Sequence, residues 1–120
     1  MTLVDTTVWA DHVKKPVAGL VKALEAEDEV LMHPFVFGEL FLGSYRGRDR
    51  LLSDLSMLQV AKLPTDSEVL EIARHFRLQG SGIGWVDCHL LASARLSGAK
   101  LMTHDLALKN ACIKAGVPRA

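Results

Sequence analysis

Short apolar segments alternate with helical patterns along the whole chain, and this alternation constrains the fold more than any other feature. Between the apolar segments, apolar residues recur at the three- and four-residue spacing of amphipathic helices. Strands that alternate with helices are typical of an α/β protein built around a parallel sheet. We expect strands at residues 2–5, 29–32, 60–63 and 99–103, and helices at residues 7–13, 17–26, 34–43, 48–58, 65–78, 85–96 and 105–115.

The composition suits one globular domain over residues 1–120. Of the 120 residues, 49% are hydrophobic and 23% are charged, which is enough to form a substantial core. Lys and Arg number 14 and are balanced by 14 Asp and Glu. The chain therefore has no overall basic field for coating nucleic acid, and an RNA or DNA partner requires a local patch.

The two cysteines and the hydropathy pattern predict a cytoplasmic protein. Cys88 and Cys112 do not have metal-ligand spacing and fit reduced thiols. Asp5 interrupts the apolar run of a signal peptide, and no apolar segment approaches the roughly 20 residues that span a bilayer. We expect no membrane association.

Two acidic residues follow expected strands. Asp5 ends the first strand, and Asp105 lies just beyond the last. In open α/β sheets, ligands bind outside the carboxyl ends of the strands, so these two acids are expected to lie close together. Each is also a favoured N-cap for the helix that follows, and that is the simpler explanation for either one alone.

Two further acids lie on apolar helices. Apolar side chains occupy the whole circumference of the helix that contains Glu39, so we expect this carboxylate to be buried and in need of a partner. The alternative is that Glu39 reaches solvent or an Arg. Asp87 falls in the apolar arc of its helix, whereas the polar arc consists of His89, Ser93 and Ser97. Its alternative role is favourable interaction with the helix dipole in the first turn.

The four acids together predict a metal site. Clustered carboxylates raise one another's pKa, so such a cluster requires a cation. Mg²⁺ fits because it binds oxygen ligands, keeps several waters and needs only one or two carboxylates. Sites of this kind catalyse phosphoryl chemistry, often with two ions about 4 Å apart.

Four segments resemble the motifs of PIN-domain ribonucleases, and specifically VapC-type toxins of bacterial toxin–antitoxin pairs. They are LVDTTVWADH, HPFVFGELFLG, GIGWVDCHLLASA and LMTHD, in the family's order and over nearly the whole chain. The resemblance implies a three-layer α/β/α sandwich with a short central parallel sheet. It also implies Mg²⁺- or Mn²⁺-dependent endonucleolytic cleavage of RNA (tRNA, rRNA or mRNA), inhibition of translation, neutralisation by a cognate antitoxin, and a homodimer.

Matched residue by residue, the resemblance assigns six positions. It implies that the metal-binding and catalytic acids are Asp5, Glu39, Asp87 and Asp105, and that the hydroxyls of Thr6 and Thr103 orient ligands or water. The chain departs from the family at His104, where many relatives have a basic residue. The segment after Gly116 is short, so a final edge strand is absent or formed in another way.

Other functions remain open at this point. A catalytically silent PIN-like module would use its acids as helix caps and its apolar surface to bind a partner. A Mg²⁺-dependent phosphatase also places an Asp after its first strand, but it needs a second acid where this chain has Thr7. A receiver domain needs an acidic pair and a late lysine that are not evident. A DNA-directed nuclease of the same superfamily would carry additional helices.

Basic and aromatic residues outside the motifs have two interpretations each. Arg46, Arg48 and Arg50 precede or begin a helix, where they grip RNA phosphates or form a solvated loop. Trp9 and Trp85 stack on bases or pack in the core or an interface, and packing is the favoured interpretation.

Overall fold

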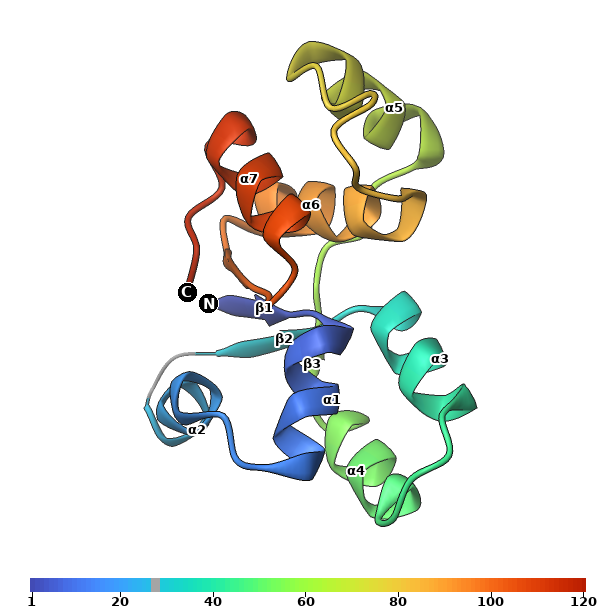
Figure 1. The fold of residues 1–120 in the computed structure, drawn as a ribbon, viewed down its shortest axis with the longest axis vertical. Coiled ribbons are helices and arrows are strands. Elements are labelled where there is room, and N and C mark those ends of the chain that lie inside the picture. The colour runs from blue at the N-terminus through green and yellow to red at the C-terminus, as the bar shows by residue number, and fades with distance from the viewer. Residues whose placement is uncertain (27–28) are drawn as a thin grey trace.

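A short parallel sheet lies at the centre of the structure, a computed structural model that describes residues 1–26 and 29–120 (Figure 1). All neighbouring strands in the described residues run parallel, in the order β3-β2-β1-β4. Leu3 of the first strand lies opposite Leu31 on one side and Leu101 on the other. The strands are β1 (Thr2–Val4), β2 (Val30–Met32), β3 (Gln59–Val60) and β4 (Lys100–Met102).

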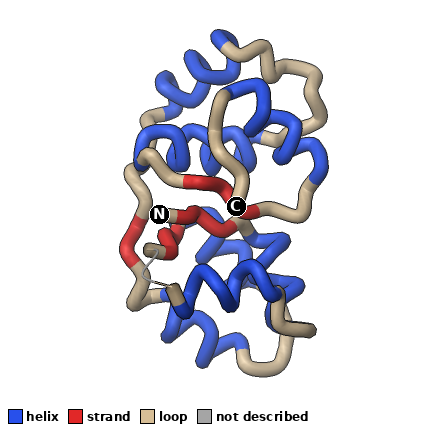
Figure 2. The backbone as a smooth tube through the Cα atoms, turned by 90° about the vertical axis from the view of Figure 1, so that its left-hand side faces the viewer, coloured by secondary structure: helices blue, strands red, loops and turns tan. Residues whose placement is uncertain are grey.

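Helices cover both faces of this sheet. In Figure 1 the helices of the first half of the chain lie below the strands and those of the second half lie above them, and Figure 2 shows the same separation from the side. The three-layer α/β/α sandwich is therefore confirmed. The helices are α1 (Thr6–Lys14), α2 (Ala18–Glu25), α3 (Pro34–Leu42), α4 (Arg48–Leu55), α5 (Asp66–His75), α6 (Trp85–Ser97) and α7 (Leu106–Ala115).

The strand order changes direction next to β1. The chain passes from β1 to β2 to β3 in one direction and then returns to place β4 on the opposite side of β1. The carboxyl ends of β1 and β4 therefore form the topological switch point of the sheet, where α/β proteins bind ligands. Asp5 follows β1 and Asp105 lies three residues after β4.

Burial on both faces explains why the sequences of the central strands are largely apolar and do not alternate between apolar and polar residues. All residues of β1 and β2 are buried because helices cover both faces. Both residues of the edge strand β3 are exposed. At the other edge, Arg119 forms an isolated parallel bridge with Leu101, and Leu101 N donates to Pro118 O at 2.9 Å. The short C-terminal segment therefore extends the sheet by one bridge.

Local sequence signals determine most helix boundaries. The capping box of Thr65 and Glu68 is present at the start of α5, and Pro34 occupies the first turn of α3. Gly98 and Gly116 end α6 and α7 in the left-handed conformation. The strand expected at residues 60–63 is instead Gln59–Val60, because only these residues pair with β2.

Two helices end earlier than expected because turns replace their last residues. After α4, Met57 N and Leu58 N bond to carbonyls three residues back, which tightens the chain into a turn. After α5, Arg77 has a φ of 54°, which the α-helix does not allow.

The two apolar helices differ from what their patterns predict. The polar arc of α6 is not a solvent-facing surface, since His89 is 5% and Ser93 is 0% exposed. This helix is covered because it packs against β1, β4, α5 and α7. Conversely, α3 is not buried all round, and Phe41 and Leu42 are 56% and 83% exposed.

Both cysteines lie in the interior of the domain. Cys88 and Cys112 are buried free thiols. Among the helices of residues 1–26 and 29–120, none has both the length and the apolar character to cross a membrane.

Candidate metal centre

Asp5 is fixed at the switch point by its backbone and its side chain. Its N–H donates to Met102 O at 3.0 Å, which ties the end of β1 to β4. Its carboxylate accepts from Val8 N at 3.2 Å and caps α1. The residue is only 2% exposed. The capping role considered from the sequence is therefore present, in a position that is also at the mouth of the sheet.

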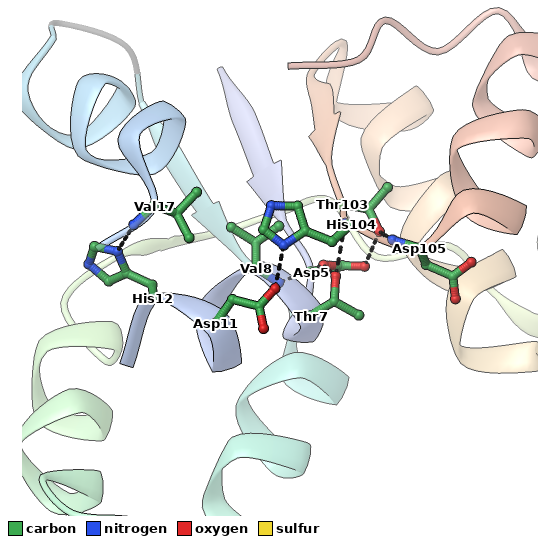
Figure 3. A network of polar contacts seen from close by, with 9 residues as sticks. All are labelled: Asp5, Thr7, Val8, Asp11, His12, Val17, Thr103, His104 and Asp105. Carbon is green, nitrogen blue, oxygen red and sulfur yellow. Dashed lines mark hydrogen bonds and ion pairs between the residues drawn. The ribbon is translucent and has the colours of Figure 1, made fainter. Parts of the chain in front are cut away.

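Two threonine hydroxyls hold the Asp5 carboxylate from opposite sides (Figure 3). Thr7 Oγ1 donates to Asp5 Oδ1 at 2.6 Å, and Thr103 Oγ1 donates to Asp5 Oδ2 at 2.5 Å. Each hydroxyl also accepts a backbone N–H from the turn after β4: His104 N bonds to Thr7 Oγ1 and Asp105 N to Thr103 Oγ1, both at 3.0 Å. The turn that leads to Asp105 is thus attached to Asp5 through two hydroxyl bridges.

The hydrogen bonds of Asp5 leave it able to bind a cation. A carboxylate has about four acceptor positions. Asp5 uses two on Oδ1, for Thr7 and Val8 N, and one on Oδ2, for Thr103. One lone pair of Oδ2 is left over, on an oxygen whose orientation is fixed by the other three bonds.

Asp105 is the N-cap of α7 and half-buried. Its Oδ1 accepts from Leu108 N at 3.2 Å. Figure 3 shows its carboxylate pointing away from the carboxylate of Asp5, with Thr103 between the two. Asp5 and Asp105 are therefore joined through Thr103 while their carboxylates point apart, and both acids also act as helix caps.

Asp87 lies in the first turn of α6, within electrostatic range of the other three acids. Burial, followed by the negative charges of Asp105, Asp5 and Glu39, raises the pKa of Asp87 to about 6. Among the described residues, no hydrogen bond or ion pair compensates its charge. Asp87 is half-buried, and its electrostatic neighbours are the other three predicted acids.

Glu39 is exposed, so the expectation that it is buried among apolar side chains is wrong. Val36 and Leu40 form the buried side of α3, and Glu39 lies to one side of them around the helix. Partial burial of the carboxyl and the charge of Asp5 nevertheless raise the pKa of Glu39, and the Thr6 hydroxyl lowers it by less. Thr6 Oγ1 is itself buried and makes no hydrogen bond of standard geometry within the described chain.

The donor set fits a hard divalent cation. Four carboxylates and the Thr6 hydroxyl are oxygen ligands, which Mg²⁺ and Mn²⁺ prefer. The raised pKa values of Asp87 and Glu39 indicate negative charge that a cation would compensate. In residues 1–26 and 29–120, no three Asp, Glu, His or Cys side chains converge on one point. A cation that keeps most of its waters does not require such a cage.

Sequence reasoning missed some residues of this region. The sequence marks Thr7 only as a position without a second acid, whereas in the structure its hydroxyl donates to Asp5 Oδ1. Its signal was local, since a hydroxyl two residues after an Asp can bond to that side chain. The contact of His104 Nδ1 with Asp11 Oδ2, at 2.6 Å, joins residues 93 positions apart, and no local pattern indicates it.

The other residues singled out in the sequence have structural roles or remain exposed. Trp9 is 3% exposed and packs in the core, whereas Trp85 is 44% exposed. Arg48 donates to Gly43 O at 3.1 Å and pairs with Asp49, so its guanidinium stabilises the turn between α3 and α4.

The three-layer fold around this parallel sheet is that of a PIN domain. The PIN domain family matches residues 2–114, and the chain belongs to that family. Ribonuclease VapC32 of Mycobacterium tuberculosis is 45% identical to this chain over 121 residues, which cover 100% of this chain and 97% of the relative.

Solved structures agree on the fold. VapBC-1 from nontypeable Haemophilus influenzae superposes with a TM-score of 0.72 at 19% identity, covering 99% of this chain and 96% of that chain. A toxin–antitoxin complex from Klebsiella pneumoniae superposes with a TM-score of 0.66 at 22% identity, covering 88% and 87%. At these identities the likeness concerns the fold alone.

Proposed function

We propose that the protein is a metal-dependent endoribonuclease toxin that hydrolyses phosphodiester bonds in RNA, inhibits translation and is neutralised by a cognate antitoxin. The observation that carries this proposal is the environment of Asp87, in which burial, followed by the negative charges of Asp105, Asp5 and Glu39, raises the pKa of the carboxyl to about 6. Four acids that share one electrostatic environment at a topological switch point are suited to cation-assisted phosphoryl chemistry. The name of the 45% identical relative, a ribonuclease, supports the same activity.

Asp5, Glu39, Asp87 and Asp105 would hold Mg²⁺, with Mn²⁺ as a substitute. The bound cation supplies charge neutralisation for the phosphate and lowers the pKa of water. Asp5 provides the rigid ligand, because Thr7 and Thr103 fix both of its oxygens. The cation would stabilise the ionised carboxylates of Asp87 and Glu39 most, since the pKa values of both are raised in its absence.

The two threonines of the predicted site would act differently. The hydroxyl of Thr103 already donates to Asp5 and accepts from Asp105 N, so it orients the acids. The hydroxyl of Thr6 has no standard hydrogen bond and adjoins Glu39, so it is the one suited to orient water or a ligand.

The proposed partners are an RNA substrate (tRNA, rRNA or mRNA), a cognate antitoxin and a second copy of the chain. We propose that the protein is cytoplasmic and that residues 1–120 form its single domain. The exposed apolar end of α3, with Phe41 and Leu42, supports an interface with a protein. The complexes named for the structural neighbours support an antitoxin.

Cleavage of labelled tRNA and rRNA by the purified protein tests the activity. We expect discrete fragments with Mg²⁺ or Mn²⁺, none with EDTA, and none with Asp87→Asn. Asp49→Asn is a matched control, because Asp49 also lies in the first turn of a helix but its side chain is 92% exposed and lies outside the acid cluster. It should cut like the wild type.

A catalytically silent module gives different results. Asp5 and Asp105 do serve as caps, and a protein that uses its acids only in this way would show no saturable Mn²⁺ binding. If the folded wild type binds no Mn²⁺, or if Asp87→Asn cuts as well as the wild type, the proposed function is wrong.

A further inference from the structure

The imidazole of His104 is paired with the carboxylate of Asp11 beside the candidate metal centre. His104 Nδ1 and Asp11 Oδ2 are 2.6 Å apart, and the two side chains are 40% and 53% exposed. Since a carboxylate can only accept, Nδ1 carries the proton and donates. Figure 3 shows the ring of His104 extending from the turn after β4 to Asp11 on α1.

The backbone of His104 is attached to the same helix. Its N–H donates to Thr7 Oγ1 at 3.0 Å, and Thr7 Oγ1 donates to Asp5 Oδ1 at 2.6 Å. Thr7 and Asp11 are four residues apart on α1 and therefore lie on one face of the helix. His104 is thus held at two points, by its backbone and by its ring, along the face that begins at Asp5.

The segments joined in this way are those that contain the strand-end acids. Asp5 is the N-cap of α1, and Asp105 directly follows His104. A shift of the turn at residues 103–105 relative to α1 would change the placement of Asp105 relative to Asp5. The Asp11–His104 contact opposes that shift at the more exposed side, in addition to the two threonine bridges.

We infer that Asp11 and His104 form a positioning pair that fixes Asp5 and Asp105 relative to each other for cation binding, and that His104 is not a phosphate contact. This inference rests on the proposed function. A basic side chain that binds phosphate must be free to offer its charge to the RNA. The ring of His104 instead contacts the carboxylate of Asp11, which compensates any positive charge on the ring and repels a phosphate.

The expected effect is moderate. Partners of metal ligands typically change metal affinity or activity about 10- to 100-fold when they are removed. Because both side chains are partly exposed and screened by water, we expect an increase of about three- to tenfold in the Mn²⁺ dissociation constant.

Two measurements on Asp11→Ala, His104→Ala and the double variant test the inference. The first is amide hydrogen exchange at His104 and Asp105 without metal, and the second is Mn²⁺ binding followed by calorimetry. We expect faster exchange at both amides and weaker Mn²⁺ binding in each single variant, and no further change in the double variant. Asp11→Asn keeps an acceptor for Nδ1–H and should restore most of the wild-type behaviour.

His12→Ala is a matched control on the same helix. His12 Nδ1 accepts from Val17 N at 3.0 Å, so this histidine supports the connection between α1 and α2. Its removal should lower stability while leaving Mn²⁺ affinity and the exchange of the His104 and Asp105 amides unchanged.

The outcomes separate this inference from the proposed function. Weaker RNA binding by His104→Ala at unchanged Mn²⁺ affinity would identify a phosphate contact and overturn the inference. Additive effects of the two substitutions would also overturn it, because they would show that the residues act independently. If the wild type binds no Mn²⁺, the proposed function fails, and unchanged amide exchange in Asp11→Ala would then overturn the positioning role as well.

Discussion

The four acids form two pairs that the fold treats in opposite ways. Asp5 and Asp105 follow strands, cap helices and have their carboxylates held by hydroxyl or backbone donors. Asp87 and Glu39 project from the helices α6 and α3, and burial together with nearby negative charge raises the pKa of both. The strand-end pair stabilises the folded chain, whereas the helix-borne pair opposes its own ionisation.

This difference indicates a division of roles. A ligand must be rigid to define the position of a cation, and the braced carboxylate of Asp5 meets this need. A cation binds strongly where negative charge is otherwise uncompensated, and Asp87 meets that need. The comparison can be tested without RNA, because it predicts opposite effects on stability for the two pairs in the absence of metal.

The largest expected effect comes from Asp5→Ala. The substitution removes an N-cap and leaves the hydroxyls of Thr7 and Thr103 without their acceptor, so the free energy of unfolding should fall by about 2–4 kcal/mol. Urea denaturation in EDTA measures this change. Asp49→Ala in the exposed first turn of α4 should cost less than about 0.5 kcal/mol, and an equal loss in both variants would contradict the special role of Asp5.

Thr103→Val should have the next largest effect. The hydroxyl donates to Asp5 Oδ2 and accepts from Asp105 N in a residue that is 6% exposed. Its removal leaves a buried acceptor and a backbone donor unsatisfied, which should cost about 1–3 kcal/mol in the same denaturation experiment. Thr103→Ser, which keeps the hydroxyl, should recover most of this loss, and failure to recover it would assign the effect to packing.

Asp87→Asn should stabilise the metal-free protein. The folded state raises the pKa of Asp87 from 3.8 to about 6. Protonation of Asp87 therefore contributes stability that is fully present below pH 3.8 and is lost as the pH rises through 6. At pH 8 the substitution removes the cost of ionisation, and we expect a gain of about 1–2 kcal/mol after allowance for solvent screening. Denaturation at pH 8 and pH 4.5 should show a larger gain at the higher pH.

Glu39→Gln should show the same sign with the smallest size. The residue is exposed, so its carboxyl is only partly buried. This partial burial, followed by the charge of Asp5, raises the pKa of the carboxyl. We expect a gain below about 1 kcal/mol at pH 8, because water screens exposed charges. A loss of stability would mean that a favourable contact stabilises the Glu39 carboxylate. Glu39 would then not share the property that defines the helix-borne pair.

The sequence predicted those features that depend on local patterns. Alternating strands and helices, the Thr65 capping box and the glycines after α6 and α7 each leave a short-range signal, and each is present in the structure. The approach of Asp5 and Asp105 followed from their positions after parallel strands. The half-buried position of Asp87 agrees with its place in the apolar arc of α6.

The rest depended on contacts between distant segments. The burial of His89 and Ser93 results from the packing of α5 and α7 on α6, which the pattern of α6 alone does not reveal. The exposure of Glu39, Phe41 and Leu42 arises because no described element covers that side of α3. The Asp11–His104 pair joins the first helix to the last turn, and its residues individually resemble ordinary surface positions.

The most direct test of the account is the titration of the Asp87 carboxyl by carbon NMR, without metal and with saturating Mg²⁺. We predict a pKa near 6 without metal and a clearly lower pKa with Mg²⁺, because the positive charge of the cation opposes the effects of burial and of the charges of Asp105, Asp5 and Glu39. A pKa near the ordinary value of 3.8 that Mg²⁺ does not change would contradict the four-acid metal centre.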